Sequence, residues 1–306
     1  MQVSNYHHRQ PKVLQRFLYH KFLIMKTILV PTDFSKASKN AAEYAVQLAG
    51  NINAKIILFH AFQIPVPTTE VPVMVITPDE FEKENEARLK KEVEGLKRKN
   101  NIEIEYLTSP GFAVDEILTI EKEKNIDLIV MGMSGAGKIS EALIGSITTA
   151  TLRKATTPVL IIPEKSIYKN PEKIVFAFDY DPRTDAHTLD ALMELMKTFD
   201  SKIYIVNVKQ KKELVSVEAA VTGLKLEGKL SNVEHVYYFP ENKDLVEGIN
   251  EFVQDKHADM VAVIPHRYNL LDRLFHTSIS KKMAFHTYVP LLALPDKHKS
   301  TAAFLM

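Results

Sequence analysis

The feature that most constrains the fold of this chain is an internal repeat. Four segments occur twice in the same order: KTILVPTDF and EKIVFAFDY, KIILFHAF and KIYIVNVK, NIDLIVMG and HADMVAVI, and GSITTATLRKATTPVLIIP and TSISKKMAFHTYVPLLALP. Residue pairs in the last two segments share one offset of 132, whereas Asp33 and Asp179 in the first pair differ by 146. Several matches at one offset indicate a duplication, with 14 fewer residues between the early and late segments of the second copy.

Within each copy, short apolar runs alternate with stretches of helical period. LIVM and VLII are apolar without alternation, which is typical of strands covered on both faces. Gly50 is expected to end the first helix. Strands separated by helices predict right-handed crossovers and a parallel sheet. The predicted fold class is α/β, with two doubly wound, Rossmann-like domains in tandem related by a pseudo-two-fold axis. The helical stripes are Ala41, Ala45, Leu48 and Ala49 in the first copy, and Leu189, Leu192, Met193 and Met196 in the second.

The repeat also sets the expected domain boundaries. The first domain spans 26–163 and the second 172–295, joined by the charged, turn-rich EKSIYKNPE and followed by a tail, 296–306. Residues 1–25 form a leader whose apolar run is interrupted by charge and lacks a small-residue cleavage site, so it does not fit a signal peptide. We interpret the leader as an extension outside the fold; a short amphipathic docking segment is the alternative.

The charge balance and the absence of cysteine limit the partners. The 39 basic and 38 acidic side chains leave no basic excess, so no nucleic-acid partner is indicated. The chain lacks the long apolar run or basic amphipathic helix that a membrane partner would need. Without cysteine there are no disulfides, thiolate nucleophiles or zinc–thiolate sites, a composition compatible with the cytoplasm.

The stretch LIVMGMSGAGKISEALIGSITTATL carries the strongest signal for function. A strand is followed by glycines at 132, 135 and 137, and Gly145-Ser146 opens the next helix. Glycines let backbone N–H groups approach an anion, and a helix start adds its positive end. GMSGAGK is one residue short of a Walker loop, has Ile139 where Ser or Thr must bind magnesium, and follows the wrong strand. The Gly-x-Gly-x-x-Gly dinucleotide pattern is also missing after the first strand.

The spacing Gly132, Gly135, Gly145-Ser146 resembles the G-x2-G-x9-G-[S/T] motif of the universal stress protein family. VPTDFS at the start and TPVLIIP at the end of the first copy are also typical of that family. The resemblance covers 26–163 well and 172–295 more weakly, and two copies resemble its tandem members. It implies a cytoplasmic, adenine-nucleotide-binding stress protein that holds ATP, with or without Mg²⁺.

The resemblance also assigns roles to residues of the first copy. Asp33 would meet the ribose and adenine side, and Ala61 would line the adenine pocket. Gly145, Ser146 and Ile147 would bind phosphate oxygens. Lys138 could add charge, although a solvated surface lysine is the simpler interpretation. The implied site consists of Pro31, Thr32, Asp33, Ala61, Met131, Gly132, Gly135, Gly145, Ser146 and Ile147.

The second copy departs from the motif. Gly132, Gly135 and Gly145 are replaced by Ile264, Arg267 and Thr277. Side chains there would occupy the space that phosphates need, so we expect a degenerate domain that does not bind ATP in the same way. Recognition of another anion by Arg267 and His266 is the alternative. Asp179 survives, and capping of the next helix would explain it.

Three classes of function remain open on sequence grounds. The first is an ATP-binding regulatory protein. The second is an enzyme for slow ATP hydrolysis or nucleotidyl transfer, but Asp33 and Glu141 are the only carboxylates near the glycine loop. The third is a partner-binding scaffold without ligand. The proline-rich QIPVPTTEVPVMVITPDE is interpreted as a lid or rim of the site, or as a plain surface loop. The final strands VLIIP and PLLALP are expected to pair within the chain, with a homodimer left open.

Overall fold

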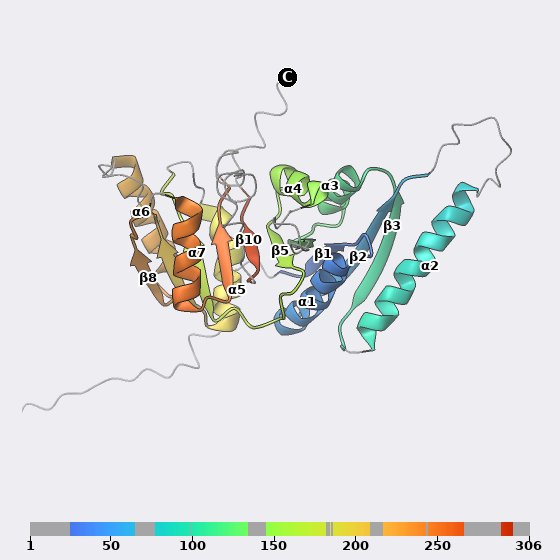
Figure 1. Cartoon of the computed structure of the whole chain (residues 1–306), viewed down its shortest axis with the longest axis horizontal. Helices are drawn as coiled ribbons and strands as arrows, with labels where there is room; N and C mark the ends of the chain where they lie inside the picture. Colours follow the sequence, from blue (N-terminus) through green and yellow to red (C-terminus); the bar gives the residue numbers. More distant parts are fainter. Residues whose placement is uncertain are drawn as a thin grey trace, which may run out of the picture.

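The chain folds around one sheet, as shown by a computed structural model that describes residues 25–64, 77–98, 100–133, 145–181, 184, 186–208, 217–242, 244–265 and 289–295. The described strands form a ten-stranded sheet of order β3-β2-β1-β4-β5-β10-β9-β6-β7-β8 (Figure 1). The strands of the first half are β1 (Thr27–Pro31), β2 (Lys55–Phe62), β3 (Ile104–Pro110), β4 (Leu128–Met133) and β5 (Val159–Pro163). Those of the second half are β6 (Lys173–Ala177), β7 (Lys202–Val206), β8 (His235–Tyr238), β9 (Met260–Val263) and β10 (Leu291–Ala293).

Helices connect these strands and cover both faces of the sheet. The first half has α1 (Lys36–Ile52), α2 (Pro78–Lys97), α3 (Ala113–Glu123) and α4 (Ser146–Lys154). The second half has a short 3-10 helix η2 (Ala186–Leu189), α5 (Asp190–Phe199), α6 (Val217–Leu230) and α7 (Leu245–Lys256). Residues of α1, α2, α5 and α6 share one buried apolar cluster, and residues of α3, α4 and α7 share the other. Both clusters continue across β5 and β10, so the two halves share a core.

The sheet repeats one strand order. Read from each outer edge inward, the order is β3-β2-β1-β4-β5 in the first half and β8-β7-β6-β9-β10 in the second. Strands within a half are parallel, whereas β5 and β10 pair antiparallel, with Ile161 opposite Leu291. The predicted doubly wound α/β class and the pairing of the two final strands within the chain are thus confirmed. Because β5 and β10 are antiparallel, the carboxyl ends of the two parallel sets lie at opposite edges.

Helix α1 is amphipathic and packs its alanine-rich face on the sheet. The predicted stripe positions are all buried, and Ser35 caps the first turn by accepting a hydrogen bond from the Ser38 N–H. The expectation that Gly50 ends this helix is wrong. The helix continues to Ile52, and Asn53 ends it in the left-handed conformation, with its N–H donating to the Ala49 carbonyl. Asn tolerates this conformation because its short side chain can bond locally.

The two halves also repeat local backbone features. Phe34 and Tyr180, which follow β1 and β6, both have positive φ angles, of 64° and 56°. The Asp127 side chain accepts a hydrogen bond from the Thr27 N–H, and the Asp259 side chain accepts one from the equivalent Lys173 N–H. These features recur at the offsets of the sequence repeat.

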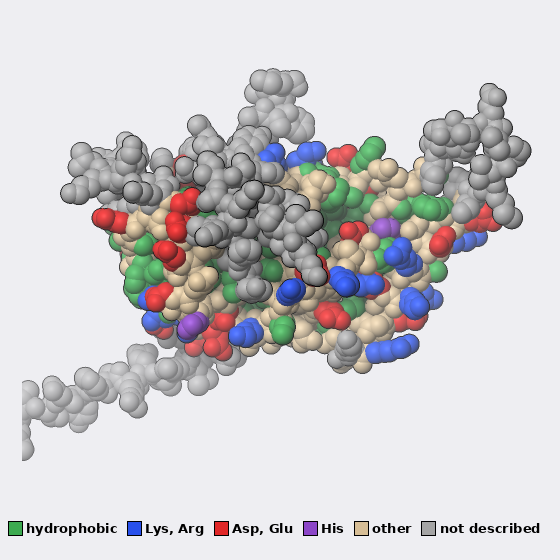
Figure 2. All heavy atoms as spheres, in the orientation of Figure 1, with side chains coloured by type: hydrophobic (Ala, Val, Ile, Leu, Met, Phe, Trp, Pro, Cys, Tyr) green, Lys and Arg blue, Asp and Glu red, His purple; other side chains and the backbone are tan. Residues whose placement is uncertain are grey.

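Helix α2 begins inside the proline-rich segment that was predicted to be a lid, rim or surface loop. Thr77 and Glu80 form a reciprocal capping box, so the last residues of the proline-rich segment start a helix, and residues 65–76 lie outside the described part. Acidic and basic side chains both spread over the face seen in Figure 2. Among the helices that the structure describes, none is long and apolar enough to cross a membrane.

Candidate functional site

A cavity of about 290 Å³ opens at the carboxyl ends of β1, β2 and β4. In the order β3-β2-β1-β4-β5, the chain direction of the crossovers reverses between β1 and β4, so this is the topological switch point of the first half. Open α/β sheets bind ligands at that point. The amino-terminal ends of α1, α3 and α4 complete the walls.

Nearly all of the residues singled out from the sequence come together around this cavity. The exception is Gly135, which, like Lys138 and Glu141, lies outside the described residues, as do Arg267 and Thr277 of the second half. Segments more than a hundred residues apart in sequence therefore meet at one place. The predicted residues that line the cavity are Pro31, Thr32, Asp33, Ala61, Met131, Gly132, Gly145, Ser146 and Ile147.

The turn after β1 holds the polar end of the site. The Asp33 carboxylate accepts the Ser35 N–H at 3.0 Å, which fixes an Asx turn, and the buried Thr32 hydroxyl donates to the Ser38 hydroxyl at 3.1 Å. Partial burial raises the pKa of Asp33, but the hydrogen bonds from Ser35 and Ser38 outweigh it, so its pKa is below the usual value. Asp33 is therefore a weak base with an exposed charge.

Gly132, at the end of β4, lies directly against the start of α1. A Cβ at this position would be 2.4 Å from both the carbonyl carbon and the oxygen of Ala37, which are backbone atoms that cannot swing aside. Only glycine fits here without moving α1. The sequence suggested glycine for contact with a ligand, and the structure adds this packing reason.

The amino terminus of α4 faces the cavity without a side-chain cap. Gly145 is the N-cap residue; among the described residues, no side chain caps the first turn and no atom lies within 4 Å of a Cβ placed on Gly145. Helix starts leave N–H groups unpaired and attract anions. The Thr148 hydroxyl donates to the Gly132 carbonyl at 3.3 Å, so α4 is tied to the end of β4.

The opposite side of the cavity is apolar. Phe59, Ile117 and Met131 are buried and line it together with Ala61 and Ala113. A flat apolar group would contact this wall while its polar substituents pointed toward the turn after β1. Phe59, Ile117 and Ala113 were not predicted from the sequence. Phe59 lies two residues before Ala61 on the same face of the strand, and this alternation is the signal that could have indicated it.

A further group of side chains lies behind the turn after β1 and was not found from the sequence. The Glu92 carboxylate on α2 is a second acceptor within reach of the Thr32 hydroxyl, at 3.4 Å, and burial raises the pKa of Glu92 despite Lys39 and Arg88 nearby. The Arg88 guanidinium lies 4.0 Å from the ring centre of Phe34. His60, which also lines the cavity, contacts Phe34 and bonds through Nδ1 to the Thr32 carbonyl at 2.8 Å.

The fold and the cavity at its switch point define a doubly wound α/β protein of the kind that holds ligands at strand ends. Comparison with known proteins narrows this class. The family model for the universal stress protein family matches residues 25–163. The universal stress protein YxiE of Bacillus subtilis is 32% identical over 143 residues, which cover 44% of this chain and 97% of YxiE. MJ0531 of Methanocaldococcus jannaschii is 27% identical over 153 residues, covering 49% and 85% of the two chains.

The crystal structure of a universal stress protein from Archaeoglobus fulgidus resembles the fold over both halves. It has a TM-score of 0.68 at 18% identity and covers 90% of this chain and 100% of that one. The chain belongs to the universal stress protein family.

Proposed function

We propose that this stress protein binds an adenine nucleotide, ATP, in the cavity of residues 26–163, and that residues 172–295 are a duplicated, degenerate copy. The observation that carries the proposal is the uncapped start of α4 beside Gly132, at the switch point of the sheet. Phosphate oxygens would accept hydrogen bonds from the backbone N–H groups of Ser146 and Ile147. Each bond of this charge-assisted kind contributes roughly 1.5–3 kcal/mol.

The two ends of the cavity support an adenine nucleoside phosphate. The apolar wall at Ala61, Ile117 and Met131 suits the base, and the turn at Asp33 suits ribose hydroxyl donors. The cavity is near the lower end of the usual size of ligand pockets, roughly 300 Å³. No group of three or more His, Asp and Glu side chains that could hold a metal occurs within the described ranges. Any Mg²⁺ would therefore be held chiefly by the phosphates and water.

The same groups argue for a regulatory rather than a catalytic role. A general base needs a pKa near the working pH, but the pKa of Asp33 is lowered by its hydrogen bonds. Glu92, whose pKa is raised, lies against the Thr32 hydroxyl and is not among the residues that line the cavity. We expect at most slow hydrolysis, with the bound nucleotide acting on conformation or on a partner.

Gly145→Asp tests the site without relying on unfolding. A carboxylate at the N-cap would bond the free N–H groups of α4 and stabilise the helix, typically by a few tenths of a kcal/mol relative to glycine. It would also occupy the phosphate position with negative charge. We therefore expect thermal stability to hold or rise while ATP binding, measured by calorimetric titration, is lost.

Gly145→Asn is the matched control, because it has the same shape and capping ability without charge. It should bind ATP more tightly than Gly145→Asp. Nucleotide released from the purified, denatured protein would identify the natural ligand. If the wild type binds no ATP, or if Gly145→Asp binds as well as wild type, the α4 start is architectural and the nucleotide proposal fails.

A further inference from the structure

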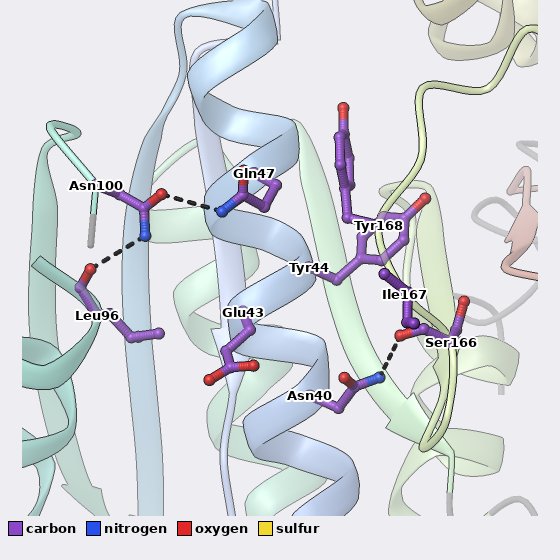
Figure 3. Close-up of a pocket in the computed structure, with 9 residues that line it drawn as sticks. All are labelled: Asn40, Glu43, Tyr44, Gln47, Leu96, Asn100, Ser166, Ile167 and Tyr168. Atoms are coloured by element: carbon purple, nitrogen blue, oxygen red, sulfur yellow. Dashed lines mark hydrogen bonds between the residues drawn. The ribbon is translucent and has the colours of Figure 1, made fainter.

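The solvent-facing side of α1 carries a second cavity, of about 360 Å³, that shares no lining residue with the nucleotide cavity. Figure 3 shows it as a trough with α1 as its floor. The end of α2 and Asn100 form one wall, and the connection between β5 and β6, with Ser166, Ile167 and Tyr168, forms the other. The trough therefore lies where the two halves are joined.

The orientations of the Asn100 and Gln47 amides along one wall are fixed by the Leu96 carbonyl, which can only accept hydrogen bonds. Asn100 Nδ2 donates to the Leu96 carbonyl at 3.2 Å, so Asn100 Oδ1 must face Gln47 and accept from its Nε2 at 3.1 Å (Figure 3). This chain of bonds leaves Gln47 Oε1 with no donor among the described residues. Gln47 itself is exposed.

The amide on the other wall follows the same logic. Asn40 Nδ2 donates to the carbonyls of Pro163 and Ser166, at 2.9 and 3.0 Å, and so uses both of its N–H groups. Its Oδ1 points away from Ser166 over the floor (Figure 3), and no described residue donates to it. The Glu43 carboxylate lies between Asn40 and Gln47. The trough thus uses these amide donors internally and leaves the oxygens of Asn40 and Gln47 on either side of the Glu43 carboxylate.

The walls add apolar surface that is held in place. Tyr168 packs edge-on against Tyr44 with ring centres 4.9 Å apart, and its hydroxyl accepts from Asn51 and donates to Asn170. Ile167 is 84% exposed. Aliphatic stems would pack on these side chains, and an aromatic face attracts cations.

The spacing of the acceptors selects an elongated ligand. Asn40 and Gln47 are seven residues apart on one helix, which places their Cα atoms roughly 10 Å apart along the axis. A single ammonium ion cannot reach both, but an extended chain with an ammonium group at each end can. We propose that this trough binds a linear polyamine, whose ammonium groups donate to Asn40 Oδ1, Glu43 and Gln47 Oε1 while its methylene groups cover Tyr168 and Ile167.

Calorimetric titration of the full chain with spermidine, without nucleotide, tests the proposal. We expect saturable binding of one spermidine. Glu43→Gln removes the charge and Gln47→Lys replaces an acceptor with a cation, and each should weaken binding at least about three- to tenfold. Glu84→Gln is the control: it makes the same charge change at an exposed position near the start of α2 and should leave the affinity unchanged.

The outcomes separate site binding from general attraction. Equal weakening by Glu43→Gln and Glu84→Gln, or no binding to wild type, would overturn the proposal. Binding of a lysine-rich peptide but not of spermidine would also overturn it and make the trough a peptide site. Gln47→Lys should keep its ATP affinity and thermal transition, so a loss of spermidine binding is not a loss of the fold.

Discussion

The ends of β4 and β9 occupy equivalent places in the two halves, but the first half has Gly132 where the second has Ile264. Beside Gly132, helix α1 begins two residues after the left-handed Phe34; in the second half, α5 begins ten residues after the left-handed Tyr180, preceded by η2. Ile264 is 3% exposed, so its side chain fills space inside the protein. The first turn of α1 uses the corresponding space. We infer that the larger residue at position 264 and the later start of α5 depend on each other, because the side chain fills the space that a nearer helix would occupy.

At neighbouring positions, the second half also has larger apolar side chains than the first. Ala61 borders the cavity, whereas its counterpart Val208 is buried and lies 3.0 Å from the Cβ position of Gly248. Thr32 joins a polar network, whereas its counterpart Phe178 packs edge-on against Tyr180, with ring centres 4.9 Å apart. The two halves therefore share a strand order and the turn after the first strand, while apolar side chains occupy these positions of the second half.

The largest effect is expected from giving the first half the residue of the second. Gly132→Ile would force α1 to move, because backbone atoms of Ala37 occupy the position of the new side chain. We expect a loss of about 3 kcal/mol in the free energy of unfolding, from overpacking. ATP binding should be lost as well. Urea denaturation and calorimetric titration measure the two effects.

Gly95→Ala provides the control for Gly132→Ile, because the Cβ position of Gly95 has no atom within 4 Å. That change should stabilise α2 by up to about 1 kcal/mol. The reciprocal Ile264→Gly should destabilise the second half without creating an ATP site there, since the start of α5 would remain displaced. Stable folding of Gly132→Ile with normal ATP affinity would contradict the close approach of α1.

The equivalent carboxylates Asp33 and Asp179 sharpen the comparison further. Each accepts the N–H two residues later, at 3.0 and 3.2 Å, and asparagine can make the same turn. Asp33→Asn and Asp179→Asn should therefore both keep this turn. Only Asp33→Asn should weaken ATP binding, by roughly tenfold, as expected for losing a charge-assisted hydrogen bond. Equal ATP affinities of the two variants would mean that Asp33 does not contact the nucleotide.

Much of this fold could be predicted because the repeat gave each pattern two independent readings. The stripe of Ala41 and Leu48, the parallel strands and the meeting of β5 with β10 all follow from local periodicity and edge pairing. The end of α1 lies three residues beyond Gly50, at Asn53, although glycine is the commoner residue at helix ends. Asn53 competes for that role, and its αL cap satisfies the Ala49 carbonyl. The capping box at Thr77 and Glu80 corresponds to TPDE in the sequence, where the neighbouring prolines obscure this helix-start pattern.

The candidate site was predictable only along the segments that carry the motif. Spacing placed Gly132, Gly145 and Ser146 together, and the cavity includes them. Glu92 lies 60 residues beyond Thr32 in an ordinary charged helix, so no local pattern could connect the two. The packing of Gly132 against Ala37 likewise depends on the angle of α1 and is not encoded in a motif.

The smallest predicted effect concerns Glu92, which makes the stability of the first half depend on pH. Burial raises the folded-state pKa of Glu92 above its usual value, so the protein favours the protonated carboxyl. The resulting stabilisation is present below the unfolded-state pKa and is lost as the pH rises through the folded-state pKa. At neutral pH, the charged carboxylate therefore costs stability, by less than about 1 kcal/mol because the group is half-exposed and screened.

Glu92→Gln removes this cost while keeping an acceptor for the Thr32 hydroxyl. The variant should be slightly more stable than wild type at pH 7, and the advantage should disappear as the pH falls toward 4. Urea denaturation across that range measures the difference, with the exposed Glu84→Gln as the control that shows no such trend. The second half has Phe178 in place of Thr32, so this pH response belongs to the first half. Parallel stability curves for wild type and Glu92→Gln would mean that the carboxyl is solvated and that the polar network ends at Ser38.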